Sequence, residues 1–129
     1  MTHPHVDRFA VRDIHPAEGG APWRWTGRNP TVRLRVSARE GLRIRADFVT
    51  AQESFAHTGP LTVRVRLNGC VAAVVKCDAE GEYRVKEEAP LECLERSGEQ
   101  QLGLELDKAH RAPDGRVLGV ILLRMGFTD

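Results

Sequence analysis

The chain has 129 residues, of which 41% are hydrophobic and 29% are charged, and its 19 basic and 18 acidic side chains leave a formal net charge of +1. These proportions are typical of an ordinary folded domain and exclude a disordered chain. The near-neutral charge gives no general attraction to nucleic acid or to an anionic membrane, so we expect neither as a partner. We expect one domain over residues 1–129, with a flexible start at 1–7.

Targeting signals and cysteine spacing bear on where the protein resides. Residues 1–8 lack the apolar core of a secretory signal, and no segment approaches the ~20 apolar residues of a membrane span. Cys70, Cys77 and Cys93 lack the close spacing of zinc or redox motifs. We therefore expect a cytoplasmic protein with reduced cysteines. A Cys70–Cys77 or Cys77–Cys93 bridge would require an oxidising compartment.

The elements that the sequence predicts are short β-strands separated by turn residues. In chain order they are residues 9–14, 23–26, 31–36, 42–48, 61–67, 71–75, 82–86, 102–106 and 117–123. Most alternate apolar and polar residues, as strands with one buried face do, and only 90–97 is expected to form one or two helical turns. The fold class is therefore all-β, and we expect a two-sheet antiparallel β-sandwich, jelly-roll-like, with eight or nine strands.

The strands at 31–36 and 42–48 are joined by five residues that include Gly41, which suits a positive φ, so we expect them to form a hairpin. The polar positions of this hairpin and of the strand at 61–67 are occupied by arginines: Arg33, Arg35, Arg43, Arg45, Arg64 and Arg66. Like charges opposite one another destabilise a sheet. Either carboxylates interleave with them or the face binds an anionic partner, and the neutral overall charge favours interleaving. The carboxylates expected to do so are Asp47, Glu82, Glu105 and Asp107.

Asn68 and Gly69 stand between the strands at 61–67 and 71–75, which predicts a tight hairpin turn. The run at 71–75, like that at 117–123, is apolar on both faces. Such runs are interior strands covered on both sides, or they form a surface that a second copy of the chain covers. The second alternative predicts a homodimer through an apolar sheet face.

The segment 50–60 is longer than a tight hairpin requires and combines aromatic, amide, carboxylate and imidazole groups, as specificity loops often do. The alternative is a connection between sheets in which Phe55 closes one end of the sandwich. Trp23 and Trp25 lie two apart on a strand and point to one face, where they pack into the core or stack on a sugar ring. The candidate ligand-binding residues are Trp25, Gln52, Glu53, Phe55 and His57.

Asp114, Gly115 and Arg116 precede the last apolar run. We expect a structural turn in which Asp114 caps backbone amides, Gly115 takes a positive φ and Arg116 pairs with a carboxylate such as Glu18. The alternative is a polar site in which the guanidinium binds a carboxylate or a vicinal diol.

The sequence predicts no catalytic site. The five histidines lack the spacing of metal ligands, the serines lack a nucleophile elbow, and no glycine-rich phosphate loop precedes a helix. We therefore expect no enzyme activity, metal or cofactor.

Three segments occur in a suggestive order: PWRWTGR at 22–28, VRVRLNG at 63–69, and LELD at 104–107 followed by PDGRVLGV at 113–120. Together they resemble the β-sandwich modules found beside bacterial glycosyltransferases and sugar-linked methyltransferases, over residues 9–127. The resemblance implies a bacterial, non-catalytic jelly-roll accessory domain associated with glycan chemistry. Because this chain has no room for a transferase domain, a separate glycosyltransferase partner would supply the enzyme. The alternative function is a structural or protein-interaction domain.

Overall fold

The computed structural model describes residues 7–15 and 24–128. Trp23, the predicted loop at 16–22 and residues 1–6 of the predicted flexible start lie outside the described residues. The elements are β1 (Asp7–Ile14), β2 (Arg24–Arg35), β3 (Arg43–Thr50), α1 (Gln52–Thr58), β4 (Leu61–Leu67), β5 (Cys70–Cys77), β6 (Gly81–Glu88), the 3-10 helix η1 (Leu91–Cys93), β7 (Glu99–Leu106), β8 (His110–Arg111), β9 (Val117–Leu118) and β10 (Ile121–Thr128). The prediction of an all-β fold is confirmed.

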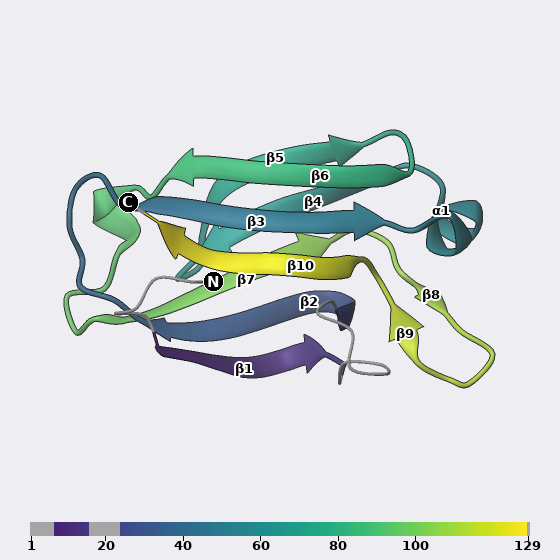
Figure 1. Cartoon of the computed structure of the whole chain (residues 1–129), viewed down its shortest axis with the longest axis horizontal. Helices are drawn as coiled ribbons and strands as arrows, with labels where there is room; N and C mark the ends of the chain where they lie inside the picture. Colours follow the sequence, from purple (N-terminus) through teal and green to yellow (C-terminus); the bar gives the residue numbers. More distant parts are fainter. Residues whose placement is uncertain (1–6, 16–23, 129) are drawn as a thin grey trace.

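Eight strands form one antiparallel sheet in the order β5-β4-β7-β2-β10-β3-β6, with β1 paired to β2, while β8 and β9 form a small second sheet. The sheet curls because β2 has two partners on one side: residues 31–35 pair with β7, and Arg24 and Trp25 pair with β10. As a result β4, β5 and β7 lie behind β3, β6 and β10, and the sheet nearly closes into a barrel (Figure 1).

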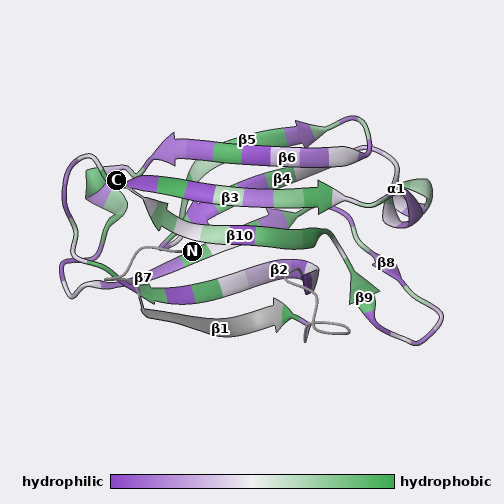
Figure 2. Ribbon diagram, viewed as in Figure 1, coloured by the Kyte–Doolittle hydropathy of each residue, from purple (hydrophilic) through white to green (hydrophobic). Residues whose placement is uncertain are grey.

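The core fills the inside of the curled sheet, and strand alternation produces it. On β3, Ile44, Ala46 and Phe48 are fully buried, and Figure 2 shows the alternation as successive green and purple bands along this strand. The Phe48 ring stacks on that of Tyr83 from the neighbouring β6, with centroids 5.7 Å apart. The inward residues of β2, β4 and β7 complete the same core.

The predicted hairpin of 31–36 with 42–48 is wrong. Gly41 does have a positive φ of 82°, but β10 lies between β2 and β3. A short connection reverses the chain without deciding which strand lies beside it, and here a strand from the other end of the chain takes that place. The strands predicted at 23–26 and 31–36 are also one continuous element, β2.

The two apolar runs differ from each other in the structure. The hairpin turn at Asn68 and Gly69 is confirmed, with φ values of 49° and 90°, but β5 is a terminal strand of the sheet order and its Val71 and Val74 are 46% and 54% exposed. The prediction of an interior strand is therefore wrong for 71–75. The run at 117–123 includes the start of β10, which does lie mid-sheet.

The strand predicted at 117–123 is interrupted at Gly119. The Gly119 N–H donates to the Thr26 carbonyl at 2.6 Å, and the Thr26 N–H donates to the Val120 carbonyl at 2.9 Å. A Cβ at position 119 would lie 2.5 Å from the Gly27 carbonyl oxygen, so only glycine allows this approach. The interruption separates β9 from β10.

The segment predicted as a loop at 50–60 contains the seven-residue helix α1. Phe55 is half-buried and packs against the core, and Ser54 is buried. The helix lies at the end of the molecule beside β8 (Figure 1).

Candidate functional site

Four of the five ligand-binding residues predicted from the sequence lie on α1, and the fifth, Trp25, lies on β2. Gln52, Glu53 and His57 are exposed on α1, and the His57 ring stacks on His110 of β8 with centroids 4.8 Å apart. Trp25 is half-buried on β2, and β10 separates β2 from β3, the strand that leads into α1.

A solvent-open hollow of about 560 Å³ lies near the opposite end of the molecule from α1. Three parts of the chain form it: the end of β2 with the neighbouring β7, the β4–β5 turn, and the segment after η1. Its lining residues are Arg35, Asn68, Glu95, Ser97, Glu99 and Gln101. The strand register places Arg35 directly opposite Glu99, so β2 and β7 contribute one continuous polar surface.

The hollow contains side chains with unused hydrogen-bonding groups. The side chains of Arg35, Glu95 and Gln101 are exposed, and within the described residues they make no side-chain hydrogen bond or ion pair. The Glu99 carboxylate is paired with the guanidinium of Arg33 at 3.6 Å, and Arg33 lies outside the hollow. The free groups are thus a guanidinium, which only donates, a carboxylate, which only accepts, and an amide, which does both.

A buried amide, that of Gln100, holds segments that line the hollow in place through hydrogen bonds. Gln100 is fully buried on β7, and its Oε1 accepts hydrogen bonds from the Asn68 Nδ2 at 2.7 Å and the Glu95 N–H at 2.9 Å. Its Nε2 donates to the carbonyls of Glu95 at 2.9 Å and Val36 at 3.2 Å. Asn68 in turn donates to the Cys93 carbonyl at 2.8 Å. These bonds fix the turn and the segment after η1 relative to β7.

The expectation of three reduced cysteines is wrong: Cys70 and Cys93 form a disulfide, with Cα atoms 6.2 Å apart. Neither bridge considered from the sequence is present, because Cys77, which both would use, is free and faces the core. Burial, with Asp78 and Asp107 adding to it, raises the pKa of the Cys77 thiol to about 11. The bridge ties the start of β5 to the segment that lines the hollow.

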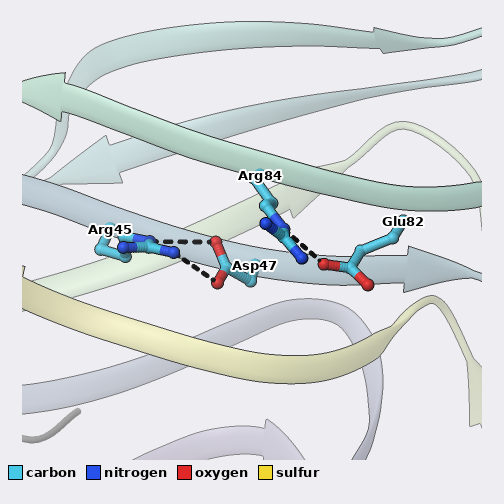
Figure 3. A network of polar contacts seen from close by, with 4 residues as sticks. All are labelled: Arg45, Asp47, Glu82 and Arg84. Carbon is cyan, nitrogen blue, oxygen red and sulfur yellow. Dashed lines mark hydrogen bonds and ion pairs between the residues drawn. The ribbon is translucent and has the colours of Figure 1, made fainter.

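The expected interleaving of outward arginines with carboxylates is found for Arg33, Arg45 and Arg66, whereas within the described residues Arg35, Arg43 and Arg64 have no carboxylate partner. Arg45 and Asp47 are paired along β3 at 3.3 Å, and Arg84 and Glu82 along β6 at 2.6 Å (Figure 3). Arg66 pairs with Glu105 at 3.1 Å. Asp107 has a different role, since its carboxylate accepts the Thr62 N–H at 2.8 Å.

Asp114, Gly115 and Arg116 form the turn between β8 and β9. The Asp114 carboxylate accepts hydrogen bonds from the Arg116 N–H at 3.0 Å and the Arg116 guanidinium at 2.8 Å, and Gly115 has a φ of 93°. The Arg116 N–H, followed by its guanidinium, holds the pKa of Asp114 below its ordinary value. The suggested partner Glu18 lies outside the described residues.

Metal-binding groups and membrane-spanning helices were looked for in the described residues. In residues 7–15 and 24–128, no group of three or more histidine, cysteine or acidic side chains is placed to hold a metal ion. The same part of the chain contains no helix long and apolar enough to cross a membrane.

Comparison with protein-family models and with curated proteins finds no match for this chain.

The sequence did not predict that the residues of the hollow form a binding site, and two of them were noted only for other reasons. Asn68 was recognised only as a turn residue and Arg35 only as one of several outward arginines. Glu95, Ser97 and Gln101 carry no local signal, because the hollow depends on β2 and β7 being neighbours, and nothing in the local alternation specifies that pairing.

Proposed function

We propose that the protein is a non-catalytic binding module that recognises a glycan in the hollow lined by Arg35, Glu95 and Gln101. The observation that carries the proposal is the set of unused groups there: a donor-only guanidinium, an acceptor-only carboxylate and an amide that does both. A sugar hydroxyl donates one hydrogen bond and accepts others. A ligand with several neighbouring hydroxyls satisfies all three side chains at once.

Charge argues against an anionic ligand. Glu95 and Glu99 both line the hollow with Arg35, so its formal charge is negative. A phosphate or nucleic-acid backbone only accepts hydrogen bonds and would be repelled by the two carboxylates. A neutral polyhydroxy ligand meets neither difficulty, and the planar Arg35 guanidinium suits a pair of adjacent hydroxyl oxygens.

The sequence resemblance to modules beside bacterial glycosyltransferases points in the same direction. We include in the proposal that the curled sheet is a jelly-roll-type sandwich and that a separate glycosyltransferase is the functional partner. The all-β antiparallel sheet supports the first part.

The proposal also includes a cytoplasmic location. The Cys70–Cys93 disulfide counts against it, because disulfides are rare in reducing compartments. Trapping free thiols in intact cells before lysis distinguishes an oxidising from a reducing location. One free cysteine per chain indicates an oxidising location, and three free cysteines indicate a reducing one.

Glycan-array screening followed by titration calorimetry with the best-binding oligosaccharide tests the proposed function. We expect Arg35→Ala to weaken binding about tenfold or more, since a hydrogen bond from a charged group contributes about 1.5–3 kcal/mol. Arg43→Ala is the matched control, because Arg43 is an exposed arginine at the start of β3, outside the hollow. Absence of any binding glycan, or equal affinities for wild type and Arg35→Ala, would contradict the proposal.

A further inference from the structure

The two terminal strands of the main sheet differ sharply in chemistry. β6 carries charged residues along its length, among them Glu82, Arg84 and Lys86. β5 carries one charge, Lys76, and its middle is a run of valine and alanine. Natural proteins protect sheet edges from pairing with other chains by placing charges on them, and of these two strands only β6 has this protection.

The β5 edge is open within the described residues. β5 pairs with β4 on one side, and no described strand pairs with its other side. Alternate backbone N–H and C=O groups of an antiparallel strand point away from its partner, so those of β5 have no ladder partner in this part of the chain. Val71 and Val74, at 46% and 54% exposure, leave apolar surface beside these groups.

We infer that β5 is a self-association edge, through which a second copy of this chain adds its own β5 in antiparallel orientation. The resulting two-fold dimer would continue one sheet through both copies. Homodimers of this kind are isologous, so the strand must be complementary to itself when reversed.

β5 meets that requirement in the register that places Val74 opposite Val74 of the second copy. Ala73 then lies opposite Val75 in both directions, and these inward residues extend the apolar layer of each core. Val74, which faces outward with Lys76, contacts its own equivalent. Valine pairs are favourable cross-strand neighbours in sheets.

Charge also favours a second copy in this arrangement. Antiparallel pairing about Val74 places each Lys76 opposite Ala72, so the two ammonium groups lie at opposite ends of the contact. Ala72 is the extra residue of an irregularity in the β4–β5 register, so the regular pairs across the two-fold axis are Val74 with Val74 and Ala73 with Val75, and each Lys76 lies at the margin of the contact. A parallel arrangement would instead bring the two lysines close together, where like charges repel.

The test is the oligomeric state of the whole chain, measured by sedimentation equilibrium at concentrations from about 1 μM to 1 mM, a range typical of modest interfaces. We expect a dimer for the wild type and a monomer for Val74→Lys. Leu123→Lys is the matched control, because Leu123 is an exposed leucine on the central strand β10, and it should remain dimeric. A wild type that stays monomeric throughout, or a Val74→Lys variant that stays dimeric, would overturn the inference.

Covalent trapping provides a second readout if Val74→Lys fails to fold. Val74→Cys should form an intermolecular disulfide under mild oxidation, because equivalent residues face each other across the two-fold axis, whereas Leu123→Cys should not. A dimeric Val74→Cys protein that does not cross-link would show that another surface joins the copies. Glycan binding by the hollow is measured separately and does not depend on this outcome.

Discussion

At Gly119 the backbone between β9 and β10 passes over Gly27 and Thr26. The Thr26 hydroxyl is fully buried there, donates to the Gly27 carbonyl at 2.9 Å and accepts the Val120 N–H at 3.2 Å. The threonine therefore satisfies polar groups that the interrupted strand would otherwise leave unpaired. One glycine and one threonine together allow the chain to leave β9 and join the middle of the sheet as β10.

We expect Gly119→Ala to destabilise the fold by about 2–3 kcal/mol, because its Cβ would lie 2.5 Å from the backbone carbonyl of Gly27 and 2.6 Å from Leu106. Urea unfolding followed by circular dichroism gives the free energy of unfolding. Gly41→Ala is the control: it has a positive φ but open space around it, so only the conformational cost of about 1 kcal/mol applies. Equal losses in the two variants would show that close packing at 119 is unimportant.

Among the elements, the segment after η1 depends on the buried amide of Gln100 rather than on its own secondary structure. η1 has only three residues and no side-chain cap. Gln100 binds the backbone of Glu95 through both of its polar atoms and reaches Val36 as well. The shape of the hollow therefore follows from β7.

Gln100→Leu should destabilise the protein by about 2–4 kcal/mol, since it leaves the Glu95 N–H and the Val36 carbonyl without a partner in a buried setting. Gln101→Leu, one residue further along β7, changes an exposed side chain and should alter stability by less than about 0.5 kcal/mol. Thermal unfolding of the wild type and both variants measures the loss of stability in each. Because Gln101 lines the hollow, its variant should lose glycan affinity while keeping stability, which separates binding from folding.

The elements also show what local sequence patterns can predict. Strand alternation identified β3, β4, β6 and β7, because inward and outward positions differ in polarity residue by residue. The helix α1 was missed because it is one short element without a side-chain N-cap, and packing of Phe55 on the core stabilises it. That contact depends on tertiary structure and leaves no periodic signal in seven residues.

For the whole molecule, strand order is the property that the sequence left undetermined. Alternation reports which face of a strand is buried, not which strand lies beside it, so the neighbours of β2 and the edge position of β5 could not be predicted. The hollow and the Cys70–Cys93 bridge follow from that order, since both join segments that are distant in sequence. Only the Asn68–Gly69 hairpin, whose pairing is local, was predictable.

The free thiol of Cys77 makes the free energy of unfolding depend on pH in the alkaline range. Its pKa is about 11 in the folded protein and about 9.0 without the protein's influence, chiefly because burial disfavours the thiolate. Below about pH 9 both states keep the proton, so the thiol adds no pH dependence. As pH rises from about 9 toward 11, the unfolded chain releases its proton first, binds fewer protons than the folded chain and is therefore favoured.

We expect the free energy of unfolding of the wild type to fall relative to that of Cys77→Ala across this range, and the difference between the two to be constant from pH 6 to 8. Urea titrations of both proteins at matched pH values measure the difference and cancel the ionisation of tyrosine and lysine. Native Cys77 should also react slowly with a thiol reagent at pH 8, because the thiolate is the reactive form and the side chain has no exposed surface. A stability difference that does not change with pH, or rapid labelling of the folded protein, would show that Cys77 is accessible to water, contrary to its position in the core.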